Sequence, residues 1–259
     1  MNSFLKAMAR AGYAARGLVY LIIGFFAVLG ALGRSEAKDS EGALASLLGQ
    51  PFGVTLVWLV IMGLAAHAAW RMLQAFFDTD GHGRKPKGLV IRAGLFVAGL
   101  SNLGLAFVAL GMVSGSGGEG GGDPTGRWLA SAAEIGLAQV ILGAVALAFA
   151  GAGAAMIWKG VKAGFEKYFR CPEDTMRWVR PLSRYGLIAR GAVFLIIAAL
   201  FVRGGLAYDA ESAPGLKDAF RAVESFDFGW LLLVAMGAGL FAFGLYSLAE
   251  ARYRHVSPP

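Results

Sequence analysis

The chain has 259 residues, of which 57% are hydrophobic and 16% charged, whereas a soluble domain carries about 25% charged residues. Together with a mean hydropathy of +0.59, this composition excludes an ordinary soluble protein. The net charge of +7 forms no continuous basic stripe with interleaved aromatic residues, so we expect no nucleic-acid partner.

Six apolar blocks follow one another along the chain. A hydrocarbon core about 30 Å thick needs about 20 apolar residues per helix, and continuous apolar runs favour helices over the alternating strands of a membrane barrel. The predicted spans are Ala11–Gly33, Gly53–Phe77, Leu89–Val113, Ile135–Trp158, Tyr185–Leu206 and Phe228–Ala249. We therefore predict an all-α integral membrane protein with six transmembrane helices.

The basic residues concentrate on alternate loops. Of the 24 Lys and Arg residues, 18 fall on the side that holds both termini and 6 on the other side. The cytoplasmic side of a membrane protein carries the excess of Lys and Arg. We expect a bacterial inner-membrane protein with both termini in the cytoplasm.

The sequence repeats internally. The first block reads RAGYAARGLVYLIIG from Arg10 and the fifth reads RYGLIARGAVFLIIA from Arg184, while the third carries a weaker copy, KGLVIRAGLFVAG, with Arg92 in the place of Arg16. The even blocks share glycines 88 residues apart. We predict one membrane domain, 1–259, containing the two-helix repeats 10–80, 87–170 and 184–254 around a pseudo-threefold axis.

Each outer loop contains a short amphipathic stretch. These stretches are Glu41–Leu48, Gly126–Glu134 and Pro214–Phe226, and the last has Leu216, Phe220 and Val223 at helical spacing. We expect three short helices on the outer membrane surface, with their apolar faces in the interface.

Three tandem two-helix units, with A-R-G at Ala15–Gly17 and Ala189–Gly191 and F-G ahead of two even helices, resemble the bacterial domain-of-unknown-function 1206 membrane family. The middle unit departs from the pattern, with Ile91-Arg92-Ala93 and no aromatic residue at Ile135. The resemblance implies the same topology and supplies no chemistry.

The first candidate site is a group of three arginines near the inner ends of the odd helices: Arg16, Arg92 and Arg190. Charges at membrane depth usually face the protein interior or a wet cavity, and a guanidinium binds carboxylate or phosphate bidentately. These arginines are expected either to form a ring that binds an anion or to extend to the interface and fix orientation.

The second candidate is a polar face on the even helices. His67, Trp70, Arg71 and Gln74 share one face at i, i+3, i+4 and i+7. The counterparts are Ala155, Trp158, Lys159 and Lys162 on the fourth helix and Phe243, Tyr246, Ser247 and Glu250 on the sixth. Glu250 is expected to pair with an arginine of the ring, and His67 either to contact a ligand or to make one bond between helices.

Other chemistry finds little support. Asn102 lies mid-membrane and is expected to bond across helices or to contact a substrate. No catalytic motif is present, the single cysteine, Cys171, excludes an internal disulfide, and we expect no cofactor and no metal.

Two functional classes remain. The first is a protein that binds or transports a small anionic solute or an anionic lipid in an intramembrane cavity. The second is a non-catalytic accessory subunit that packs against a membrane protein partner. Polar residues inside the membrane favour the first class.

Overall fold

The structure is a computed structural model that describes residues 2–33, 40–79, 81–115, 138–207 and 216–255. Within these ranges the chain is helical, with α1 (Asn2–Ala31), α2 (Ser40–Leu48), α3 (Gly53–Phe77), α4 (Pro86–Ser114), α6 (Ala138–Val161), the 3-10 turn η1 (Glu166–Tyr168), α7 (Glu173–Ala207), α8 (Leu216–Glu224) and α9 (Gly229–Tyr253). Six of these helices are long and apolar enough to cross a membrane: α1, α3, α4, α6, α7 and α9. The prediction of a six-helix membrane protein is confirmed.

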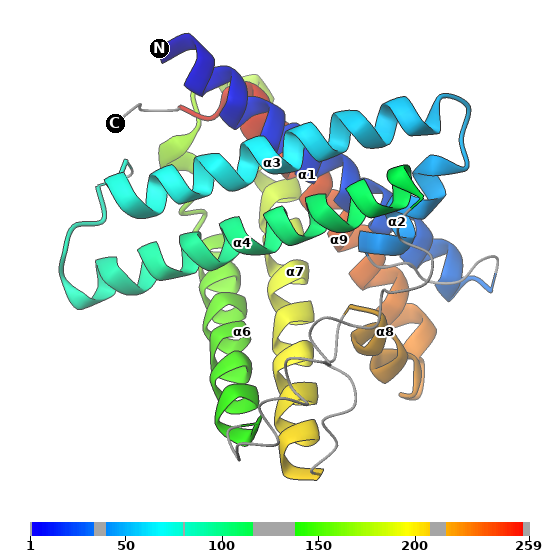
Figure 1. The fold of residues 1–259 in the computed structure, drawn as a ribbon. Coiled ribbons are helices and arrows are strands. Elements are labelled where there is room, and N and C mark those ends of the chain that lie inside the picture. Colours follow the sequence, from blue (N-terminus) through cyan, green and yellow to red (C-terminus); the bar gives the residue numbers. More distant parts are fainter. Residues whose placement is uncertain (1, 34–39, 80, 116–137, 208–215, 256–259) are drawn as a thin grey trace.

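The six long helices contact one another in the order α4, α3, α1, α9, α7 and α6, a series that we call the incomplete ring. The closest pairs are α1 with α9, α3 with α4 and α6 with α7, and α1–α3 and α7–α9 contacts join them. Figure 1 shows the α3–α4 pair crossing the α6–α7 pair steeply, with both termini close together at one end of the molecule. We call that end the terminal face.

The first and third repeats cross their two helices in the same way. Gly12 of α1 lies against the backbone of His67 in α3, and Gly63 of α3 lies against Ala15 of α1. In the third repeat, Gly186 lies against Phe243 and Gly239 against Ala189. A side chain on any of these glycines would collide with the facing helix, so this close approach explains why glycine recurs there.

The middle repeat does not make this crossing. Among the described residues, α4 and α6 show no packing comparable to that of the other neighbours in the ring. A side chain on Gly94 or Gly104 of α4, or on Gly143 or Gly151 of α6, would meet no atom of the described residues within 4 Å. The pseudo-threefold arrangement is therefore not confirmed, and we call the side between α4 and α6, where the described residues make no such crossing, the lateral opening.

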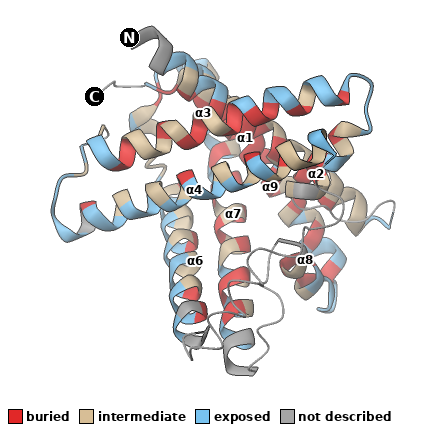
Figure 2. Cartoon of the chain, in the orientation of Figure 1, coloured by how far each residue is buried: buried red, intermediate tan, exposed pale blue. Residues whose placement is uncertain are grey.

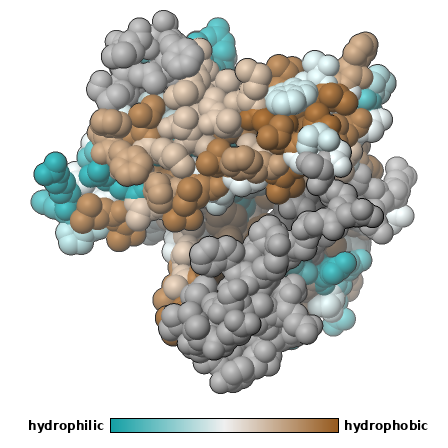
Figure 3. All heavy atoms as spheres, in the orientation of Figure 1, coloured by the Kyte–Doolittle hydropathy of each residue, from teal (hydrophilic) through white to brown (hydrophobic). Residues whose placement is uncertain are grey.

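The six long helices differ in how many of their residues are buried. Within the apolar windows of α4 and α6, 17% of residues are buried, against 39–50% in the other four long helices. Figure 2 shows the buried residues concentrated where α1, α3, α7 and α9 face one another. In Figure 3 the outward surface of α3 and α4 is largely hydrophobic, with hydrophilic residues at the end where the two helices connect, as expected for a surface that faces lipid.

The short helices do not present their apolar faces to the membrane as the sequence suggested. In α2, Ala43 and Leu44 are buried, and in α8, Phe220 and Val223 are buried, all within the same core as the long helices. These faces pack on the bundle because apolar side chains there gain protein contacts. The third expected surface helix, Gly126–Glu134, lies outside the described residues.

The same turn leads into α3 and α9. Phe52 and Phe228 adopt a left-handed backbone, with φ of 61° and 60°. Each is followed by a glycine whose added side chain would meet carbonyl oxygens of the preceding short helix: Gly53 meets Leu48, and Gly229 meets Val223. This close packing explains the F-G pairs in the sequence.

The largest boundary difference concerns α7. Hydropathy places its start at Tyr185, whereas the helix begins at Glu173 and continues through Pro181. The first turns are polar and extend beyond the apolar block, so a pattern based on hydropathy does not include them.

Candidate functional site

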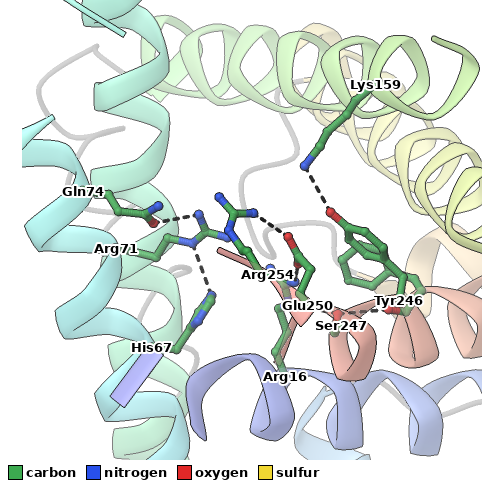
Figure 4. A network of polar contacts seen from close by, with 10 residues as sticks. Arg16, His67, Arg71, Gln74, Lys159, Tyr246, Ser247, Glu250 and Arg254 are labelled. Atoms are coloured by element: carbon green, nitrogen blue, oxygen red, sulfur yellow. Dashed lines mark hydrogen bonds and ion pairs between the residues drawn. The ribbon is translucent and has the colours of Figure 1, made fainter. Parts of the chain in front are cut away.

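Charged side chains gather between the helices in the half of the bundle nearest the terminal face, and most of them are drawn in Figure 4. We call the five cations the basic cluster: Arg16 of α1, Arg71 of α3, Lys159 of α6, Arg190 of α7 and Arg254, which follows α9. They lie around one carboxylate, Glu250 of α9. Every long helix except α4 contributes to this arrangement.

Glu250 is bound by two arginines. Its side chain is 2% exposed, and it accepts a hydrogen bond from Arg16 Nη2 at 2.5 Å and another from Arg254 Nη1 at 2.6 Å. Arg16 Nε also donates to Ser247 Oγ at 3.1 Å. A buried carboxylate is tolerated when it is paired and hydrogen-bonded, so these bonds fix α1 against α9.

Arg71 has only neutral hydrogen-bond partners in the described part of the chain. Its Nε donates to His67 Nε2 at 3.3 Å, and its Nη1 donates to Gln74 Oε1 at 3.0 Å. Its guanidinium also lies 5.7 Å from the Tyr13 ring centroid. The charge of Arg71 is therefore solvated by dipoles and a ring, without a carboxylate of its own.

Lys159 and Arg190 are held in a similar way. Lys159 Nζ donates to Tyr246 Oη at 3.1 Å. The Arg190 guanidinium lies 4.4 Å from the Phe243 ring centroid and 4.8 Å from that of Tyr20. Aromatic faces attract a cation by about 0.5–2 kcal/mol, which offsets part of the cost of placing these charges inside the bundle.

The cluster carries more positive than negative charge. Among the described residues that meet there, five cations face one carboxylate, which leaves a net charge of +4. Two like charges 4 Å apart repel by about 4 kcal/mol at an effective dielectric constant of about 20. The described part of the cluster thus keeps an excess of positive charge that Glu250 alone does not neutralise.

Several buried donors near the cluster lack a hydrogen-bond partner among the described residues. His67 accepts from Arg71 at Nε2, so its ring proton lies on Nδ1, and that nitrogen has no partner. Tyr13 Oη, Trp70 Nε1 and Arg190 Nε are also buried without one. An unpaired buried donor costs about 1–3 kcal/mol, and each of these groups can donate to an oxygen-rich ligand.

A short segment covers the cluster at the terminal face. In residues 165–170, which we call the terminal lid, Phe165 and Phe169 are buried against Tyr246. Arg170 N donates to Tyr253 O at 2.9 Å, and His255 N donates to Tyr168 O at 2.8 Å. The lid is therefore fastened to the end of the chain by a β-bridge.

The structure brings together most of the residues predicted from the sequence. Arg16 and Arg190 lie near the same ring, with guanidinium carbons 5.2 and 4.4 Å from the Phe243 centroid. The described contacts also place the following predicted residues in or beside the cluster: His67, Trp70, Arg71, Lys159, Tyr246 and Glu250.

Arg92 does not join the other two arginines. Its Nε donates to Ala75 O at 2.7 Å and its Nη2 to Phe76 O at 3.0 Å, so it caps the carboxyl end of α3. Arg184 caps the end of α6 in the same way, through Gly160 O and Val161 O. Arg92 thus corresponds to Arg184.

The sequence alignment of the middle repeat is corrected accordingly. Arg92-Ala-Gly94 matches Arg10-Ala-Gly12 and Arg184-Tyr-Gly186, and Ala98 then takes the place of Arg16 and Arg190. The arginine ring therefore has two members and not three.

Asn102 makes its described hydrogen bond within its own helix, and a contact with a substrate stays a prediction. Its Nδ2 donates to Ala98 O of the same helix at 2.6 Å, so the described contacts give it no bond across helices. The amide satisfies the carbonyl one turn earlier because that acceptor lies within reach on its own helix.

Sequence reasoning missed two participants, Arg254 and the terminal lid. Arg254 follows Glu250 by four residues, the spacing at which opposite charges meet on a helix. That signal was available, but Arg254 lies beyond the apolar block and was counted only as a loop charge. The lid carries no such pattern.

Among the described residues, no group of three or more His, Cys, Asp or Glu side chains is placed to hold a metal ion. The one cysteine is poorly suited to thiolate chemistry, since burial raises the pKa of the Cys171 thiol.

Comparison with known proteins gives a family and no activity. The sequence profile of a family described as Domain of Unknown Function (DUF1206) matches residues 11–78 and 185–254. An uncharacterized protein of Bacillus subtilis (strain 168), YxxB, is 30% identical over 257 residues, which cover 98% of this chain and 93% of the relative. No solved structure matches the chain.

Proposed function

This chain belongs to the DUF1206 family of multi-pass membrane proteins, and we propose that it binds an anion in the basic cluster. One observation carries the proposal: five cations meet around a single carboxylate, and the two arginines nearest that carboxylate already occupy both of its oxygens. The remaining cations make no hydrogen bond or ion pair with a carboxylate in the contacts of the described residues.

Arg71 and Lys159 are the groups that would hold the ligand. Arg71 donates only to the neutral His67 and Gln74, and Lys159 donates only to the Tyr246 phenol in the bonds described. Bonds between charged partners are roughly twice as strong as neutral ones. A carboxylate or phosphate would therefore displace these neutral partners and gain free energy.

The distribution of basic residues supports a particular side of the membrane for the site. With 18 of 24 basic residues on the side of the termini, the terminal face lies in the cytoplasm in this proposal. The cluster then takes its anion from the inner half of a bacterial inner membrane or from the cytoplasm.

The test is binding of a panel of anions to the detergent-solubilised protein, measured by calorimetry: inorganic phosphate, glycerol phosphate and phosphatidylglycerol in mixed micelles. Replacing Arg71 by Gln should weaken binding of the preferred anion at least about tenfold, since one charge-assisted contact contributes about 1.5–3 kcal/mol.

The matched control is Arg92→Gln, which removes an arginine outside the cluster and should leave the affinity unchanged. If no anion of the panel binds in a manner that depends on Arg71, the proposed function is wrong.

A further inference from the structure

The basic cluster is closed on the side from which a water-soluble ligand would enter. The terminal lid places Phe165 and Phe169, which are 0% and 8% exposed, over Tyr246. Arg180 holds the lid from α7 through two bonds to Glu166, at 2.5 and 3.0 Å. Together with the β-bridge to the end of the chain, these contacts leave the lid shut in this conformation.

The bundle is open in a different direction. Among the described residues, the long helices contact one another in the order α4, α3, α1, α9, α7 and α6, and α4 and α6 do not pack together comparably. Gly94 and Gly151 are exposed among the described residues, whereas the equivalent glycines of the other repeats are buried at helix crossings. These unpacked apolar faces of α4 and α6 are suited to contact with the hydrocarbon of a bilayer.

The α4 side of this opening lacks the cation that the other repeats supply. In the corrected alignment, Ala98 stands where α1 has Arg16 and α7 has Arg190. Gly94, Val97 and Ser101 follow one another along the exposed side of α4, and none carries a charge. A hydrocarbon chain can lie along such a surface, whereas a hydrated ion gains nothing there.

The α6 side joins the opening to the cluster. Gly151 and Lys159 lie about two turns apart on α6, and Lys159 donates a hydrogen bond to Tyr246 of α9. An apolar groove of about 470 Å³ between α6 and α7 includes Gly143, Leu147 and Leu195 in its lining. The same helix thus offers an apolar surface toward one end and a charged group toward the other.

We propose that the ligand of the basic cluster is an anionic phospholipid that enters between α4 and α6. Its headgroup phosphate contacts Arg71 and Lys159, and its acyl chains lie in the lateral opening. The inference rests on the proposed function, and it commits the site to a membrane amphiphile because the terminal lid covers the cluster at the terminal face while apolar faces of α4 and α6 stay unpacked among the described residues.

The experiment measures lipid retention by native mass spectrometry and affinity by calorimetry in mixed micelles. We expect the wild-type protein to bind phosphatidylglycerol at least tenfold more tightly than phosphatidylcholine, and at least tenfold more tightly than soluble glycerol phosphate. Gly151→Trp and Gly94→Trp should each fill the opening and weaken phosphatidylglycerol binding at least tenfold, with an unchanged thermal transition.

The matched control is Leu59→Trp, at a position that is 62% exposed on α3 away from the opening; it should bind as the wild type does. Equal affinity for glycerol phosphate and phosphatidylglycerol, or unchanged lipid binding in both glycine variants, would overturn the inference while the Arg71 result still supported the proposed function. Unfolding of both variants would also overturn it, because it would show that the opening is packed.

Discussion

Replacing Glu250 by Gln should destabilise the protein and at the same time tighten anion binding. The substitution removes the carboxylate that pairs with Arg16 and Arg254 at 2.5 and 2.6 Å. Breaking a buried ion pair by removing one partner costs about 3–5 kcal/mol, because the other charges remain uncompensated. The net charge of the cluster rises from +4 to +5, so a bound anion is attracted more strongly.

The free energy of unfolding is obtained from equilibrium unfolding in mixed micelles, followed by circular dichroism, with and without the preferred anion. Saturating anion should restore more stability to Glu250→Gln than to the wild type, since a ligand that binds only the folded state stabilises it according to its affinity.

The control is Glu166→Gln, because its partner Arg180 has a side chain that is 51% exposed. An exposed pair contributes about 0–1 kcal/mol, so this variant should unfold almost as the wild type does. If Glu250→Gln lost less than about 1 kcal/mol, the view of Glu250 as the buried counter-ion of the cluster would be refuted.

Three further predictions concern the surroundings of the site. Gly63→Leu and Gly239→Leu should each destabilise the protein by about 1–3 kcal/mol through overpacking, whereas Gly151→Leu should be neutral in the same unfolding assay; equal losses at all three positions would contradict the open middle repeat. Arg92→Gln should lower stability by about 1–3 kcal/mol through loss of two bonds to the end of α3, and a change in its anion affinity would show that Arg92 belongs to the cluster. Backbone hydrogen bonds from Gly83 and His82 hold the pKa of Asp78 below its ordinary value; Asp78→Asn should therefore be less stable than the wild type at neutral pH, with the difference disappearing as pH falls through that lowered pKa, and a difference that persists in acid would point to another cause.

Hydropathy and helical spacing predicted much of this architecture. Apolar blocks long enough to cross a bilayer have few alternatives to helix, so the six spans followed directly. His67, Arg71 and Glu250 were recognisable because polar residues at helical spacing inside apolar blocks are rejected by lipid. These residues come together once the polar faces of α3 and α9 both turn toward the interior of the bundle.

Other features depended on contacts between distant parts of the chain. Arg92 was aligned with Arg16 because similar apolar residues follow both. The spacing from the arginine to the next glycine instead matches Arg92 with Arg184, and only the hydrogen bonds to α3 made this clear. The lateral opening has no local signal, since α4 and α6 keep the glycines of a close crossing. The terminal lid is defined by a bridge between residues more than 80 positions apart.

The left-handed turns at Phe52 and Phe228 relate the free energy of folding to the medium around two phenyl rings. A bulky residue in that conformation costs about 1–3 kcal/mol, and both side chains are turned outward, with 85% and 76% of their surface exposed. Each lies directly before a helix long and apolar enough to cross a membrane. Transfer of such a ring from water into an apolar medium gains about 1.5–3 kcal/mol, which is similar in size to the strain at each turn. We therefore expect the free energy of these two turns to depend on the medium around the rings, and to be lower beside lipid than in water.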